Sequence, residues 1–170
     1  MNDDQRTIYN AVMQAVAHAD GCFFVDGPGG TGKTFLYNTL LSTVRSSGDI
    51  AVAVASSGIA ALLMKGGRTA HSRFKIPLKL NESLTCNISK NSKEARLINS
   101  SKLFIWDKAP MIHKFAFEAL DRTFRDITQV NKPFGGKVFV FSGDFCQVLP
   151  VIPRASHAEV VSVSLSRSYL

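Results

Sequence analysis

The octapeptide GPGGTGKT at residues 27–34 constrains the fold of this chain more than any other feature. It matches the pattern GxxxxGK[ST], in which a glycine-rich turn joins a buried strand to the helix that follows. A short apolar run, 22–25, precedes the turn, and residues 35–41 have the composition of a helix. Because both flanks fit, the sequence predicts a strand–loop–helix unit of the kind found in parallel α/β sheets.

The residues of this loop have the chemistry of a polyphosphate site. Glycines lack a Cβ, so several backbone N–H groups can turn toward one anion, and the helix starting near Lys33 adds its positive dipole end. Lys33 would contact the β- and γ-phosphates, and the Thr34 hydroxyl would coordinate Mg²⁺. The alternative is a glycine-rich turn that matches by chance. The nucleotide-binding residues predicted from this loop are Gly27, Gly29, Gly30, Thr31, Gly32, Lys33 and Thr34.

The rest of the chain alternates helix and strand patterns. The expected helices span residues 3–19, 33–47, 59–64, 93–99 and 114–129, and the expected strands span 22–26, 50–55, 103–106 and 138–141. This alternation predicts one α/β domain over residues 1–170, with a mostly parallel sheet covered by helices on both faces. Residues 78–100 are polar and weakly periodic, so a loop or insertion is expected there.

Two of the expected strands end in polar residues at the edge where ligands bind in such sheets. Asp107 directly follows the apolar run 103–106, which is the usual position of the aspartate that holds Mg²⁺; the alternative is a helix N-cap. Gln147 follows the last strand and can hydrogen-bond a γ-phosphate or the attacking water. The alternative for this second segment is an ordinary turn at Gly143 and Asp144.

The positive charge of the chain is concentrated in one segment. Residues 65–114 hold eleven Lys/Arg and three Asp/Glu, a surplus of eight, whereas the remaining residues hold nine and ten. Such a patch suits a polyanion such as nucleic acid, the alternative being a solvated surface. His71 has Arg68 and Arg73 near it in sequence, which favours a phosphate-contacting loop. Phe74 stands among these basic side chains and is the candidate for stacking on a base.

Other classes of protein are disfavoured by composition. No apolar run approaches the ~18 residues of a membrane span, and the polar N-terminus does not resemble a secretory signal. The three cysteines are far apart and lack zinc spacing, so a reducing intracellular compartment is expected. The aromatic residues expected in the core of the domain are Phe115, Phe117 and Phe124.

Several segments together resemble the first motor domain of the Pif-one DNA helicases, a superfamily-one branch, and most of all its plant and helitron-transposon members. The resemblance covers nearly the whole chain in the right order, and only residues 78–100 match loosely. The matching pieces are Gln5, GPGGTGKT at 27–34, SSGIAALLMKGGRTAHSRFKIP at 56–77, FIWDKAPM at 104–111, FEALDRTFRDI at 117–127 and SGDFCQVLPVIP at 142–153.

This resemblance implies a RecA-like P-loop NTPase fold and ATP-driven unwinding of DNA in the 5′-to-3′ direction. It further implies ATP and Mg²⁺ as cofactors, single-stranded DNA as partner, a nuclear location, and roles in repair, recombination and telomere maintenance. By match, Gln5 would contact the adenine, Lys33 and Asp107 would be catalytic with Gln147 as γ-phosphate sensor, and Thr34 and Asp107 would hold the metal. The residues that would line the DNA path are Ser57, Gly58, Thr69, His71 and Ser72.

The chain departs from the family pattern in three respects. Lys108 stands where the family has the glutamate that polarises water, and a lysine protonated at neutral pH cannot accept that proton. Cys146 and Ser142 replace a usual arginine and glycine, and the sequence given ends at Leu170 without a second RecA-like domain. These departures raise the alternative of a hydrolysis-impaired, non-enzymatic remnant that binds nucleotide and DNA. A small P-loop kinase is a third alternative, which the extended helicase-like motifs disfavour.

Overall fold

A single parallel sheet organises the part of the chain that the computed structural model describes, residues 1–144. Its strands lie in the order β1-β5-β4-β2-β3, and each neighbouring pair is parallel. The strands span Cys22–Asp26 (β1), Ile50–Ala55 (β2), Arg68–Thr69 (β3), Ser101–Asp107 (β4) and Val138–Gly143 (β5). The predicted parallel sheet is therefore confirmed, and β3 is a strand that periodicity could not detect because it has two residues.

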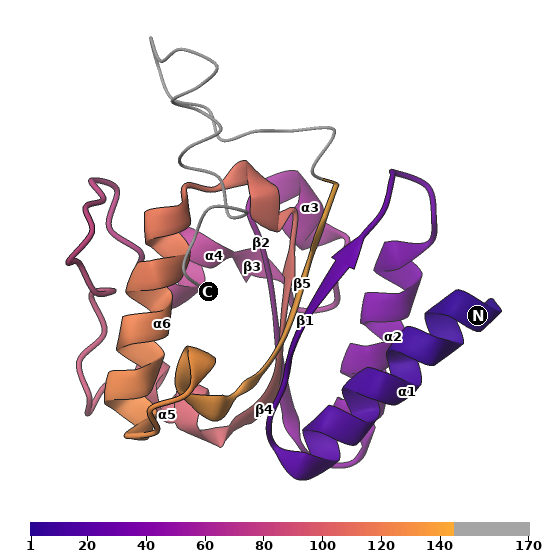
Figure 1. Cartoon of the computed structure of the whole chain (residues 1–170), viewed down its shortest axis with the longest axis horizontal. Coiled ribbons are helices and arrows are strands. Elements are labelled where there is room, and N and C mark those ends of the chain that lie inside the picture. Colours follow the sequence, from indigo (N-terminus) through magenta and orange to yellow (C-terminus); the bar gives the residue numbers. More distant parts are fainter. Residues whose placement is uncertain (145–170) are drawn as a thin grey trace, which may run out of the picture.

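Helices cover both faces of this sheet, as predicted (Figure 1). One face carries α1 and α2, the other carries α4, α5 and α6, and α3 lies beside the carboxyl ends of the strands. The helices span Asp3–His18 (α1), Lys33–Ser46 (α2), Gly58–Leu62 (α3), Ala70–Phe74 (α4), Lys93–Ser100 (α5) and Lys114–Thr128 (α6), with 3₁₀ turns Ala109–Met111 (η1) and Pro133–Gly136 (η2). No helix within residues 1–144 is long and apolar enough to cross a membrane.

The domain has two hydrophobic cores, one on each face of the sheet, because successive side chains of a strand point to opposite faces. In β4, Leu103 and Ile105 pack toward α1 and α2, whereas Phe104 and Trp106 pack toward α6. All four side chains are fully buried. A strand covered on both faces must be apolar throughout, which explains the uninterrupted apolar run that precedes Asp107.

Phe74 belongs to the second core, so the prediction that it stacks on a nucleic-acid base is wrong. Its side chain is 1% exposed, and its ring lies 5.7 Å from that of Phe124 and 6.1 Å from that of Phe104. Helix α4, which was not predicted, turns Phe74 inward while its basic neighbours stay nearer the surface. The core placement of Phe117 and Phe124 is confirmed, and Phe115 is partly buried.

Residues 78–100 are only partly irregular, because α5 occupies the last eight of them. The irregular part is fastened to α6 by two side chains. The Arg122 guanidinium donates to the Leu84 carbonyl at 2.6 Å, and the Thr123 hydroxyl accepts from the Cys86 amide at 2.8 Å. These bonds hold the segment against α6 without regular secondary structure.

Candidate nucleotide-binding site

The glycine-rich loop lies where the sequence predicted, at the bend between β1 and α2. The backbone amide of Gly27 donates to the carbonyl of Gly143 at 3.2 Å, which ties the start of the loop to the end of β5. Because β5 also pairs with β4, Asp107 at the end of β4 lies on the same edge of the sheet. The loop and Asp107 are thus brought together across one intervening strand.

Two glycines of the loop have backbone conformations that L-residues rarely adopt. Gly30 has φ 82° and Gly32 has φ 78°. At Gly30 a Cβ would meet nothing within 4 Å, whereas at Gly32 it would lie 2.6 Å from Nε2 of Gln5. The dihedral angle therefore favours glycine at residue 32, and a Cβ there would also have to displace the side-chain amide of Gln5.

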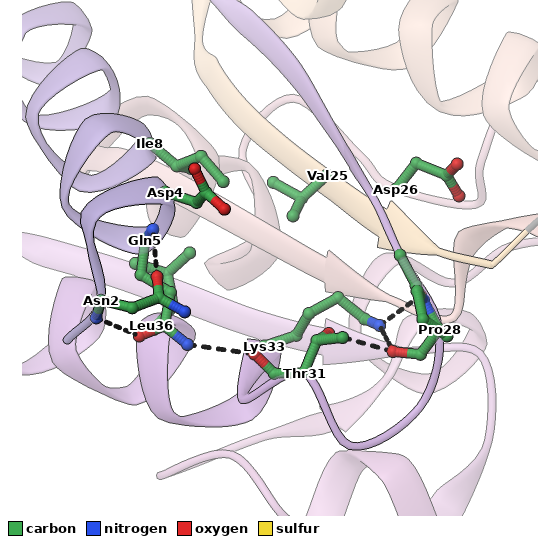
Figure 2. Close-up of a pocket in the computed structure, with 11 residues that line it drawn as sticks. Asn2, Asp4, Gln5, Ile8, Val25, Asp26, Pro28, Thr31, Lys33 and Leu36 are labelled. Carbon is green, nitrogen blue, oxygen red and sulfur yellow. Dashed lines mark hydrogen bonds between the residues drawn. The ribbon is translucent and has the colours of Figure 1, made fainter.

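The Lys33 ammonium is folded back over the loop (Figure 2). It donates hydrogen bonds to the carbonyls of Gly27 and Pro28, the latter at 2.7 Å. The Thr31 hydroxyl donates to the same Pro28 carbonyl at 3.0 Å. This arrangement holds a positive charge inside the curve of the loop, where an anion would be surrounded by backbone amides.

Gln5 fastens the first turn of α1 to this loop. Its Nε2 donates to the Thr31 carbonyl at 3.1 Å, and its Oε1 accepts from the Asn2 amide at 3.1 Å. The Asn2 side chain in turn accepts from the Gln5 amide, which completes a capping box. Gln5 is therefore placed beside the loop, and its contact with adenine stays a prediction.

A cavity of about 360 Å³ lies between α1 and the loop (Figure 2). Its size falls in the range of about 300–1,000 Å³ that is common for small-molecule sites. Its lining combines the apolar side chains of Ile8, Val25 and Leu36 with polar and charged ones. The lining residues are Asn2, Asp4, Gln5, Ile8, Val25, Asp26, Gly27, Pro28, Thr31, Lys33 and Leu36.

Asp107 ends β4 with its side chain 6% exposed, at the carboxyl edge of the sheet. Its Oδ1 accepts a hydrogen bond from the hydroxyl of Ser142, 2.8 Å away, and Ser142 is fully buried. The carboxylate of Asp107 and the hydroxyl of Thr34 are hard oxygen donors of the kind that suits Mg²⁺, which usually takes one or two protein ligands beside substrate phosphates. Within residues 1–144 no group of three or more His, Cys, Asp and Glu side chains could hold a metal.

Tyr37 is a residue of this region that the sequence did not reveal. Its hydroxyl is buried near Ser142 but makes no hydrogen bond of standard geometry within the described residues. Burial raises the pKa of Tyr37; the Ser142 hydroxyl opposes that shift and the charge of Asp107 adds to it. The sequence does show a tyrosine on the apolar face of the helix after the loop. Nothing in the neighbouring residues indicates which strand that tyrosine faces, so its place beside Ser142 could not be predicted.

Lys108 follows Asp107 directly and lies in the left-handed region, with φ 60° and ψ 35°. It precedes η1, whose Pro110 packs closely on the end of β5: a Cβ at Gly143 would lie 2.3 Å from Cδ of Pro110. The carboxyl ends of β4 and β5 are therefore in tight contact. This contact fixes the backbone that presents both Asp107 and Lys108.

The residues predicted to line a DNA path gather at the same edge of the sheet, because Ala55 of β2 pairs with Thr69 of β3. Ser57 caps α3 by accepting from the Ala60 amide, and Thr69 caps α4 by accepting from the Ser72 amide. Gly58 begins α3, and His71 and Ser72 lie in α4.

Two further points bear on these predictions. Burial lowers the pKa of His71 below its ordinary value, so the ring is less readily protonated than a free histidine. Gln147, the predicted γ-phosphate sensor, lies outside the described residues together with Cys146.

Comparison with known proteins gives a consistent result. The family model described as "PIF1-like helicase" matches residues 1–170. The chain is 34% identical over 143 residues to the human ATP-dependent DNA helicase PIF1, covering 83% of this chain and 22% of that protein. It is 29% identical over 160 residues to the Candida albicans protein of the same name, covering 92% of this chain and 17% of that protein.

Solved structures show the same fold. A Bacteroides Pif1 helicase in complex with ADP-AlF3 and ssDNA superposes with a TM-score of 0.80 at 25% identity, covering 99% of this chain and 38% of that one. A structure of two coordinating Pif1 helicases at forked double-stranded DNA gives a TM-score of 0.79 at 26% identity, covering 99% and 40%. The present chain thus spans between about a sixth and two fifths of the length of these proteins.

Proposed function

This chain belongs to the PIF1-like helicase family, and we propose that it is the ATP-binding motor domain of an ATP-dependent DNA helicase that moves 5′ to 3′ on single-stranded DNA. The observation that carries the proposal is the position of the loop 27–34 at the strand–helix bend, with Asp107 on the same edge of the sheet. Because the chain spans 22% of the human relative, unwinding, repair and recombination are proposed for a protein that joins this domain to a second motor domain.

Nucleotide binding requires the loop to exchange its internal contacts for phosphate. The Lys33 ammonium now satisfies two carbonyls, and a polyphosphate entering the loop offers it stronger, charge-assisted acceptors. The backbone amides of residues 29–34 and the positive end of the α2 dipole would add to the attraction for that anion. Thr34 and Asp107 would hold Mg²⁺, which when bound neutralises charge developing on the phosphates.

Coupling to DNA is proposed to run along the carboxyl edge of the sheet. Ser56, which begins the segment after β2, donates its amide to the Asp107 carbonyl at 3.1 Å. Its hydroxyl accepts from the Trp106 indole N–H at 3.0 Å. The segment bearing Ser57 and Gly58 is therefore bonded directly to the end of the strand that carries Asp107, which gives the nucleotide site a short connection to the proposed DNA path.

A second candidate function is favoured by Lys108. This residue stands beside Asp107 where a glutamate would accept the proton of water, and a missing general base typically lowers rate by ~10²–10⁴-fold. The alternative is accordingly a domain that binds nucleotide and DNA but hydrolyses ATP poorly. Both functions share the nucleotide site and differ only in turnover.

The deciding experiment for the nucleotide site is the variant Lys33→Ala. Hydrogen bonds to charged groups contribute about 1.5–3 kcal/mol, so we expect its affinity for Mg-ATP to fall at least about tenfold, measured by calorimetry. Lys65→Ala, an exposed lysine outside the cavity, should bind as the unmodified chain does. Equal affinities in Lys33→Ala and the unmodified chain would exclude the loop as the polyphosphate site.

A further inference from the structure

A second pocket lies between α4 and α5, beside β3, which is at the opposite end of the strand order from β1. Its volume is about 160 Å³, and its walls are largely basic. The residues that line it are Arg68, Ser72, Arg73, Lys75, Lys93, Glu94 and Leu97. None of these residues contributes to the cavity beside the glycine-rich loop.

The charges in this pocket are not balanced. Four cationic side chains face one carboxylate, Glu94, whose ion pair with Lys75 is long at 3.9 Å and largely solvated. A solvated pair of this kind neutralises little. The pocket therefore keeps a net positive charge of about three, which favours an anionic ligand.

One nitrogen of the Arg73 side chain lacks a hydrogen-bond partner, although the residue as a whole is only partly buried. Its Nε is shielded from solvent and finds no hydrogen-bond acceptor among residues 1–144. Burial and then the neighbouring Arg68 lower the pKa of Arg73, which means that the folded chain disfavours this charge. An acceptor oxygen placed in the pocket would satisfy the donor and relieve the repulsion between the two guanidinium groups.

The fold holds these cations together through apolar anchors on the opposite sides of their helices. Ala70 and Phe74 of α4 and Ala95 and Ile98 of α5 are buried against the sheet. Arg73 lies directly before Phe74, and Lys93 begins α5. The core therefore holds the two helices that carry most of these basic side chains.

We propose that this pocket binds a backbone phosphate of single-stranded DNA. Arginine guanidinium groups match the geometry of phosphate oxygens, and a phosphate supplies the acceptor that Arg73 lacks. Ser72 lies both in this pocket and among the residues proposed to line the DNA path, so the two sites are continuous. The choice of DNA over free phosphate rests on the proposed function, and the pocket adds a phosphate contact beyond the residues named there.

The test measures binding of a fluorescein-labelled oligothymidylate to the 170-residue chain by fluorescence anisotropy, at a series of salt concentrations. Arg73→Gln and Lys93→Gln should each weaken binding about tenfold at low salt. Each should also reduce the slope of log K against log salt by about 0.7, the value for one lost phosphate contact on a single strand. Arg96→Gln is the matched control, because Arg96 is exposed on α5 outside the pocket.

The possible results distinguish a failure of the pocket assignment from a failure of the proposed function. Unchanged affinity and slope in Lys93→Gln, which is exposed and should fold normally, would overturn the pocket while DNA binding by the chain stands. An unmodified chain that binds Mg-ATP but not the oligonucleotide would overturn both DNA assignments and leave the nucleotide site. If inorganic phosphate raises the Tm of the unmodified chain but not of Arg73→Gln, and oligonucleotide binding is equal in both, the pocket serves free phosphate and the DNA assignment is wrong.

Discussion

At the residue scale, the nearly buried Asp107 carboxylate is hydrogen-bonded by a neighbour that is fully buried. Ser142 donates to Oδ1 of Asp107 from a fully buried position on β5. The hydroxyl of this serine gives the carboxylate a hydrogen-bond donor that a glycine at the same position could not supply. One oxygen of Asp107 is thus oriented by β5.

We expect Ser142→Ala to lower the free energy of unfolding by about 1–3 kcal/mol, because it leaves a buried carboxylate oxygen without its donor. Urea denaturation measures this change. Tyr37→Phe is the matched control: it removes a neighbouring hydroxyl that makes no standard hydrogen bond, so its cost should stay below about 0.5 kcal/mol. Equal losses in the two variants would show that the Ser142–Asp107 bond contributes nothing of its own.

At the scale of elements, the loop between β1 and α2 is shaped by α1 as well as by its own glycines. The first turn of α1 delivers Gln5 against the Thr31 carbonyl, and Gly32 leaves the space in which Gln5 lies. A helix that begins 30 residues before α2 thus helps to define the phosphate loop.

We expect Gly32→Ala to weaken Mg-ATP binding more than Gly30→Ala does. Both substitutions place a side chain at positive φ, which costs ~1–2 kcal/mol, but only the Cβ at residue 32 collides with Gln5. Calorimetric titration of each variant with Mg-ATP provides the comparison. Adding Gln5→Ala to Gly32→Ala should recover part of the difference, and a double variant no better than the single one would argue against the collision.

At the scale of the whole molecule, the residues proposed to bind ATP and DNA lie along one edge of a sheet whose two faces are covered by helices. The relatives are several times longer than this chain, which is 17% of the Candida albicans protein and 22% of the human protein. Hydrolysis coupled to movement is therefore a property to be tested in a protein that joins this domain to a second motor domain.

In such a two-domain protein, Lys108→Glu is expected to raise DNA-stimulated ATPase activity by ~10²–10⁴-fold, because it supplies the missing general base. Steady-state release of inorganic phosphate is the measurement. Lys108→Gln removes the positive charge without adding a base and should give a much smaller gain. High activity with Lys108 unchanged would show that another carboxylate, such as Asp144, accepts the proton.

Sequence alone determined the local parts of this protein. Three local patterns predicted their elements nearly to their ends, because each depends only on residues close together in the sequence. They are the glycine pattern at 27–34 for the loop, the apolar run before Asp107 for β4, and the amphipathic period of residues 114–129 for α6. Helix α4 was missed because five residues do not establish a period, and Phe74 was therefore placed on the wrong side.

The tertiary structure decided what depends on residues far apart in the chain. Strand order placed β5 between β1 and β4, and so brought Ser142 to Asp107 and Gly143 to Gly27. The packing of helices on the sheet placed Gln5 against Thr31 and brought Arg68, Arg73 and Lys93 together around one pocket. Periodicity and capping depend on residues that are close together in the sequence. These contacts depend on how strands and helices from distant segments pack together, and no single segment specifies that packing.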